Sequence, residues 1–171
     1  MGPDQARADG GTAGAPGVAL AQVVNPLLVV REHDLVFGTV FAGQASGSVT
    51  VTPSARTFYG GGVQSACLPA TCTPPHPAAF RVQGEAGRSY HVGVPDTINA
   101  AGNLLDGGGS AAGLVVQRLT VETASRPGSG GNGVLDAVGV DRFTIGATLL
   151  VPGSLPAASY RATVPVIVTY G

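Results

Sequence analysis

The chain has 171 residues, enough for a single domain with a sizeable core. Only 11% of the residues are charged and the net charge is −1, which excludes a strongly basic surface for nucleic acid and an acidic tail. All nine cationic residues are arginines, which excludes Schiff-base chemistry and lysine-based covalent crosslinks. With 27 glycines and 13 prolines, the composition is typical of short strands joined by turns.

The N-terminal stretch "GGTAGAPGVALAQVVNPLLVV" (10–30) passes from small residues to a dense apolar run. Residues 1–17 have the composition of a disordered tail. A signal peptide needs a basic region and then a continuous apolar stretch, and neither is present. The 13 residues from Val18 to Val30 are too few for a membrane-spanning helix, which needs about 20. We therefore expect no transmembrane segment.

Two interpretations are open for the residues before Pro26. In the first, residues 23–30 form the first strand and the preceding residues are a loose tail. In the second, Val18, Leu20, Gln22 and Val24 form one face of a donor strand that completes a neighbouring molecule, with smaller residues opposite. We expect the second, because exposed apolar residues on a free tail favour aggregation. Residues 1–25 are then a flexible extension and residues 26–171 a domain.

Alternation of apolar and polar residues with period two predicts about nine strands, bounded by Gly, Pro, Asn or Asp. The strands are expected at 23–30, 35–41, 47–52, 80–84, 89–94, 114–121, 134–140, 142–151 and 161–171. Residues 97–105 are expected to form a short helix or a loop. This pattern predicts a single antiparallel, immunoglobulin-like or pilin-like β-sandwich. Its large core residues are Phe37, Phe80, Tyr90 and Phe143.

The last expected strand has a proline in its middle. Val164, Val166, Val168 and Tyr170 share one of its faces. Pro165 has no N–H to donate, so the strand is expected at the edge of a sheet. An edge strand has unpaired backbone groups to which another strand can add. We therefore predict that these four residues edge the groove that accepts the donor.

Cys67 and Cys72 lie close together in "ACLPATCT". In an oxidising compartment this spacing predicts a disulfide that closes a short loop. The alternative is a metal site in which both cysteines and His76 supply three ligands, although a structural zinc site needs four. The other titratable residues are scattered, and no serine lies in a G-x-S-x-G turn. We therefore expect a disulfide, no metal or other cofactor, and no enzymatic activity.

A set of motifs in fixed order carries a family resemblance. They are "PLLVVREHDLVFGTV" (26–40), "GQASGSVTVTPS" (43–54), "GGV" (61–63), "AAFRVQGEAGRSYHVGVP" (78–95), "GNGVLDAVG" (131–139) and "FTIGATLLVPGSLPAASYRATVPVIVTYG" (143–171). Over roughly residues 26–171 the chain resembles the bacterial family called domain of unknown function 4402. That resemblance implies a secreted or surface protein of Gram-negative bacteria whose last strand is similar to that of fimbrial subunits. The cysteine-bearing insert 65–77 is longer than this resemblance implies.

These observations predict a structural subunit of an extracellular filament that polymerises by strand donation. Its partners would be further copies of itself, with a periplasmic chaperone or an outer-membrane assembly factor as a second class of partner. The alternative is a monomeric secreted adhesin or binding module. It would use the loops at 65–77, 106–113 and 124–133, because loops often carry recognition.

Overall fold

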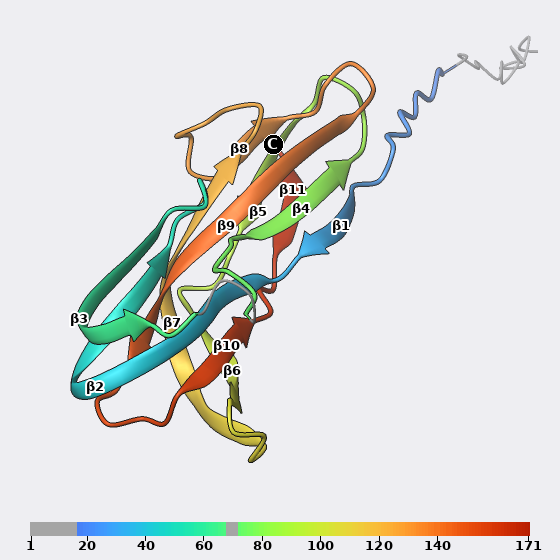
Figure 1. Ribbon diagram of the computed structural model, residues 1–171. Coiled ribbons are helices and arrows are strands. Elements are labelled where there is room, and N and C mark those ends of the chain that lie inside the picture. Colours follow the sequence, from blue (N-terminus) through green and yellow to red (C-terminus); the bar gives the residue numbers. More distant parts are fainter. Residues whose placement is uncertain (1–16, 68–71) are drawn as a thin grey trace, which may run out of the picture.

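The computed structural model describes residues 17–67 and 72–171, and these residues form eleven β-strands and no helix (Figure 1). The strands are β1 (Leu28–His33), β2 (Leu35–Val51), β3 (Thr57–Ser65), β4 (Ala78–Gln83), β5 (Ser89–Gly93), β6 (Thr97–Leu104), β7 (Ser110–Thr123), β8 (Asn132–Val134), β9 (Val140–Val151), β10 (Ala158–Ala162) and β11 (Ile167–Tyr170). All their pairings are antiparallel. The prediction of an all-β protein is confirmed.

Eight of these strands form one large sheet, in the order β1-β4-β9-β7-β6-β10-β2-β3. Because β2 also pairs with β9, the strands β9, β7, β6, β10 and β2 close into a barrel. The first part of β2 bonds to β10 and its last five residues, Gly47 to Val51, bond to β9. A register shift between Ala42 and Gly47 lies between the two parts. Where the sequence predicts one two-sheet sandwich, the structure has this barrel and a separate small sheet.

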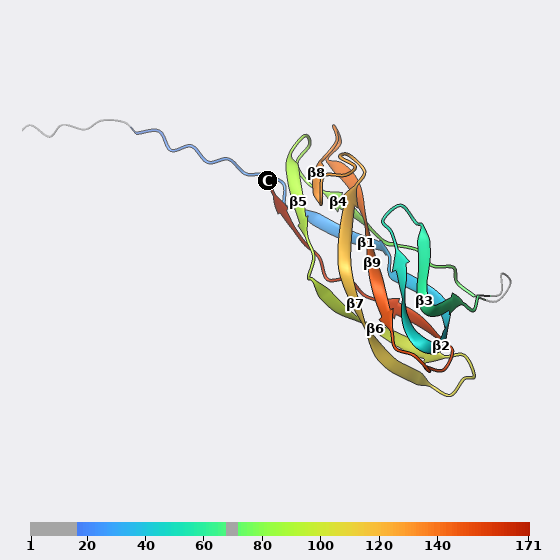
Figure 2. The same ribbon diagram turned by 90° about the vertical axis from the view of Figure 1, so that its left-hand side faces the viewer.

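The small sheet has the order β11-β5-β8. It lies at one end of the molecule with β1 and β4, while β2, β6 and β10 lie at the other end (Figures 1 and 2). Its inner residues Tyr90 and Val92 belong to the same hydrophobic core as the barrel residues. The Tyr90 hydroxyl donates a hydrogen bond of 2.7 Å to Asp141 of β9. The small sheet is therefore fixed to the large one by packing and by a buried polar contact.

The four predicted aromatic anchors are all in the core. Phe37, Phe80, Tyr90 and Phe143 have at most 4% of their surface exposed. Phe80 and Phe143 lie opposite each other in the β4–β9 ladder, and their rings stack with centroids 5.0 Å apart. Cross-strand aromatic pairs of this kind stabilise a sheet beyond the area that they bury. The four aromatic residues of the core were therefore predictable from the sequence.

Three predicted elements between the first and the last strand differ from the observed ones. Residues 97–104 form strand β6 instead of a helix or loop, because they pair with β7 on one side and β10 on the other. The expected strands 35–41 and 47–52 are two parts of the continuous β2. The expected strand 134–140 is mainly a turn, in which the Asp136 carboxylate accepts hydrogen bonds from the N–H groups of Val138 and Val140.

Candidate functional site

The C-terminal strand has one side without a partner. β11 pairs with β5 and is the end strand of the small sheet in the described chain. Val164 is buried, and Val166, Val168 and Tyr170 are half-buried against the core, whereas Ile167 is 72% exposed. This confirms the predicted alternation of facing side chains. Val168 and Tyr170 therefore lie on the open-edge strand with their side chains turned inward, whereas Val164 and Val166 precede this strand.

The extent of this strand is shorter than predicted. The expected strand 161–171 is divided into the end of β10 at Ala162 and β11 from Ile167 onward. Pro165 lies between the two strands and is exposed. The physical reason is its missing N–H, which cannot join a ladder, and its fixed backbone angle. The proline therefore separates two strands that belong to different sheets.

The first strand, β1, is the corresponding open edge of the large sheet. It pairs with β4 alone in the described structure. Val29, and Leu27 just before the strand, pack against the core but remain half-buried. The predicted first strand at 23–30 is thus present but begins five residues later, at Leu28. Two sheet edges, β1 and β11, therefore have incompletely covered apolar side chains.

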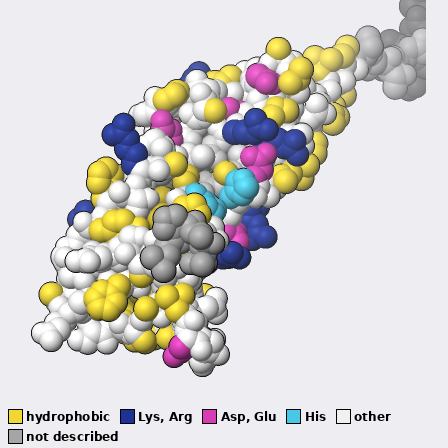
Figure 3. All heavy atoms as spheres, in the orientation of Figure 1, with side chains coloured by type: hydrophobic (Ala, Val, Ile, Leu, Met, Phe, Trp, Pro, Cys, Tyr) yellow, Lys and Arg dark blue, Asp and Glu magenta, His cyan; other side chains and the backbone are white. Residues whose placement is uncertain are grey.

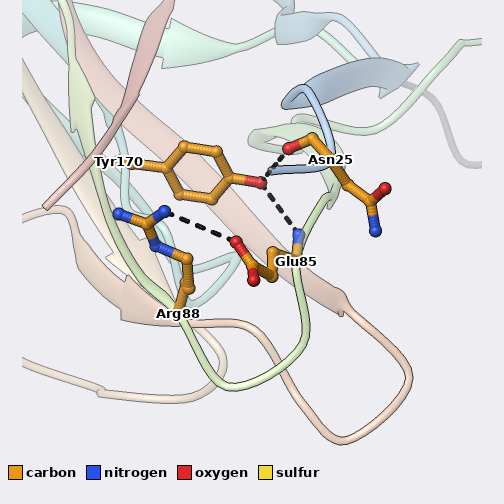
Figure 4. A network of polar contacts seen from close by, with 4 residues as sticks. All are labelled: Asn25, Glu85, Arg88 and Tyr170. Carbon is orange, nitrogen blue, oxygen red and sulfur yellow. Dashed lines mark hydrogen bonds and ion pairs between the residues drawn. The ribbon is translucent and has the colours of Figure 1, made fainter. Parts of the chain in front are cut away.

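A polar contact joins the end of β11 to the chain just before β1 (Figure 4). The Tyr170 hydroxyl donates a hydrogen bond to the Asn25 carbonyl oxygen at 2.5 Å and accepts one from the Glu85 N–H at 2.8 Å. The Arg88 guanidinium carbon lies 4.5 Å from the centre of the Tyr170 ring, and the same guanidinium pairs with Glu85 at 3.4 Å. The sequence identifies Tyr170 as an inward-facing residue, but no local pattern marks it as the anchor of Asn25.

Beyond Asn25 the chain leaves the body. Residues 17–27 form no strand, and the part that precedes Asn25 extends away from the domain in both ribbon views. Val18, Leu20 and Val23 are 85%, 94% and 94% exposed. Gln22 is exposed as well, and Val24 is half-buried beside the anchor. Hydrophobic side chains cover this segment and the adjoining end of the body (Figure 3). The part of the predicted extension at 1–16 lies outside the described residues.

The predicted disulfide between Cys67 and Cys72 is present, with the two Cα atoms 5.6 Å apart. Because each sulfur is bonded to the other, neither is a thiolate ligand for zinc. Among the described residues, no group of three His, Cys, Asp or Glu side chains is placed to hold a metal. The flanks of this loop are fixed to β2: the N–H of Ala66 bonds to the Thr39 carbonyl, and His76 exchanges two backbone hydrogen bonds with Val36.

A buried carboxylate, which the sequence reasoning missed, lies beneath the loop at 124–131. Asp141 is 9% exposed and accepts hydrogen bonds from the hydroxyls of Tyr90 and Ser125 and from the Arg142 N–H. Burial, together with this hydrogen bond and the negative charge of Asp141, raises the pKa of Tyr90 far above its ordinary value. The Ser125 hydroxyl in turn accepts from the Val134 N–H. These hydrogen bonds around Asp141 and Ser125 connect β5, β8 and β9.

A comparison with known protein families identifies the family of this chain. The model of a family described as a domain of unknown function (DUF4402) matches residues 27–170. The chain belongs to the DUF4402 family. The DUF4402 match covers every described strand from β1 to β11 and begins two residues after the Asn25 anchor. No curated protein and no solved structure matches the chain. In the described part of this DUF4402 protein, no helix is long and apolar enough to cross a membrane.

Proposed function

We propose that this protein is a non-enzymatic structural subunit of an extracellular bacterial filament. Residues 18–24 of one subunit would add as a strand to the open edge of β11 on the next. The observation that carries the proposal is the pairing of an exposed apolar segment with an open, half-covered strand edge on the same chain. The apolar segment lacks a surface that covers it, and the β11 edge lacks a neighbouring strand. A second copy of the chain provides both the surface and the strand.

The arrangement of the open edges fits a pilin-like interpretation of this end of the fold. The small sheet β11-β5-β8 shares its hydrophobic core with the barrel, and the end of its edge strand β11 contacts the chain just before β1 through the Tyr170–Asn25 hydrogen bond. A strand inserted beside β11 would gain a backbone ladder. Its large side chains would gain about 1.5–3 kcal/mol each when fully buried. Val18, Leu20 and Val24 are the residues that would provide this burial.

The compartment in this proposal is the bacterial cell surface. The Cys67–Cys72 disulfide fits an oxidising environment outside the cytoplasm. Before assembly, the open edge and the apolar segment are a liability for non-specific strand pairing. A periplasmic chaperone or an outer-membrane assembly factor that covers the edge would prevent this pairing, and we include such a partner in the proposal. No catalytic role is assigned, because the buried Asp141 group is occupied by structural contacts.

The donor half of the proposal is tested with the double variant Val18→Asp and Leu20→Asp in the full chain. Both side chains are exposed, so the domain should keep its fold while charged residues are excluded from an apolar groove. We expect wild-type protein to form filaments in negative-stain electron microscopy and the variant to stay monomeric in light scattering. Val138→Asp is the matched control, since Val138 is 80% exposed in a turn far from the segment in sequence. Filaments from the double variant would refute donation by this segment.

The acceptor half is tested with Val168→Asp, whose circular dichroism spectrum shows whether the domain remains folded. We expect this variant also to fail to form filaments. An equimolar mixture with the donor variant should give heterodimers without longer polymers, because one intact donor meets one intact acceptor. Mixed filaments, or a mixture that stays fully monomeric although both proteins are folded, would contradict the proposed pairing.

The second candidate function is a monomeric secreted binding module. A hollow of about 700 Å³ beside the disulfide loop favours it, because loop-walled concave surfaces are common recognition sites. The hollow and the β11 edge are formed by different strands, so binding in the hollow is compatible with either state of assembly. The light-scattering measurement on wild-type protein separates a polymerising subunit from a monomer.

A further inference from the structure

The hollow lies on the outer face of β6 and β10, which are different strands from the β11 edge of the proposed assembly. Its floor comes from alternate residues of these two strands, and Ala66, Cys72 and Thr73 at the ends of the disulfide loop form one wall. Asn99, Ala101 and Asn103 share one face of β6, and Ser159 and Arg161 share the same face of β10. The hollow therefore has a floor fixed by sheet hydrogen bonds.

Polar side chains form part of the lining and follow the strand register, beside apolar residues such as Ala101 and Leu105. Besides the buried Tyr160, six residues with a hydroxyl or amide side chain contribute to it: Thr39, Thr73, Asn99, Asn103, Ser159 and Thr163. Ser159 pairs with Asn103 on one side and with Thr39 on the other, which forms a polar row across three strands. The Thr39 and Ser159 hydroxyls lie 2.8 Å apart. Within the described chain, the Asn103 side chain is exposed and can bond a ligand.

Arg161 is the one charged residue among the described residues that line the hollow. It is exposed, and the ion pairs of the described chain involve Arg31, Arg88 and Arg142 instead. The residue opposite Arg161 on β6 is Ala101, whose small side chain leaves space in front of the guanidinium. An arginine without a carboxylate partner in a concave, polar surface is suited to bidentate recognition of an external carboxylate.

We propose that this hollow binds an acidic sugar. The carboxylate would pair with Arg161, and the ring hydroxyls would bond to the amides of Asn99 and Asn103 and to the hydroxyl of Thr163. Ala101 and Leu105 offer apolar surface for the C–H face of the ring. This combination of many neutral donors and acceptors with one cation fits a ligand that has many hydroxyls and one negative charge. The inference concerns binding by the subunit and is independent of how the subunit assembles.

The test uses saturation-transfer difference NMR on the full chain, because this method observes the ligand and works for a monomer or a filament. The probes are methyl α-D-galacturonide and methyl α-D-galactoside, which differ only in the carboxylate. N-acetylalanine is the third probe, a carboxylate without sugar hydroxyls. We expect transfer to the galacturonide and at least tenfold weaker binding of the other two, since the charged hydrogen bonds and the hydroxyl contacts are each needed.

Two variants locate the site. Arg161→Gln should weaken galacturonide binding about tenfold, and Asn103→Ala should weaken both sugars. Arg56→Gln is the matched control, because Arg56 is equally exposed but lies in the turn between β2 and β3. Galacturonide binding that survives Arg161→Gln, or that is equalled by the galactoside, would overturn the proposal. Equal binding of N-acetylalanine would also overturn it, in favour of a peptide carboxylate. Absence of any transfer from the wild-type protein would reject the site altogether.

Discussion

The Tyr170 hydroxyl donates a hydrogen bond to the Asn25 carbonyl oxygen, across 145 positions of the chain. This contact fixes the base of the N-terminal segment at the end of the edge strand β11, and the segment points away from the body (Figure 2). The point at which the proposed donor segment leaves the body is therefore fixed by β11, the strand that forms the proposed acceptor. A residue near the C-terminus thus defines where the N-terminal extension begins.

Tyr170→Phe tests this anchor. The substitution removes the hydrogen bonds to Asn25 and Glu85 and keeps the aromatic ring beside Arg88. We expect the free energy of unfolding to fall by about 1 kcal/mol, the usual net contribution of a partly exposed hydrogen-bonded hydroxyl. Urea unfolding followed by circular dichroism measures it. Tyr59→Phe is the control, because Tyr59 is also partly exposed and its hydroxyl has no hydrogen-bond partner in the described chain. Equal stability of the two variants would contradict the anchor.

The buried Tyr90–Asp141 pair predicts a pH dependence at the alkaline end. The ordinary pKa of tyrosine is 10.0, and burial raises the pKa of Tyr90 in the folded state. Above pH 10.0 the unfolded chain loses this proton while the folded protein keeps it, so the contribution of Tyr90 to stability falls as pH rises. We expect Tyr90→Phe to be less stable than wild type at pH 8, and the difference to shrink in urea titrations at about pH 11. Parallel stability curves for the two proteins would contradict this assignment.

The disulfide predicts a modest loss of stability on removal. Closing the short loop between Cys67 and Cys72 restricts the unfolded chain only slightly, so we expect the double variant Cys67→Ser and Cys72→Ser to lose about 2 kcal/mol. Differential scanning calorimetry with and without reductant measures the change. The reductant should lower the melting temperature of wild type and leave the double variant unaffected. A wild-type melting temperature that does not respond to reductant would show that the bond adds no stability.

We expect substitution of Gly38 to lower stability by more than its backbone angle alone would cause. It has φ of +75°, and an added Cβ would lie 2.9 Å from Cγ of Pro75 in the disulfide-loop flank. Gly87 has φ of +74° and open space around it, so Gly87→Ala measures the backbone strain by itself. We expect about 1 kcal/mol of destabilisation for Gly87→Ala and clearly more for Gly38→Ala. Equal losses would show that the loop flank does not press on β2.

The local features of this protein were predictable from sequence because they depend on neighbours in the chain. Alternation in residues 164–170 predicted which side chains of the last segment face inward, and the spacing of Cys67 and Cys72 predicted their disulfide. The apolar character of residues 18–24 and the interruption at Pro26 predicted a domain that begins at residue 26. In each case the residues that determine the feature are only a few positions apart, so the local sequence pattern is enough to predict it.

The closed barrel, the strand identity of residues 97–104 and the Tyr170–Asn25 anchor were decided only by the tertiary structure. β6 has small residues and a weak alternation, and it is a strand because β7 and β10 offer hydrogen bonds on both sides. β2 is one strand because two different neighbours bond to its two parts. Backbone pairing between distant segments leaves no local pattern to read, since every residue has the same N–H and C=O groups. The sequence by itself determined which apolar side chains alternate toward the core, because this pattern is local, whereas the tertiary structure decided which strands they join and that Asp141 is buried among them.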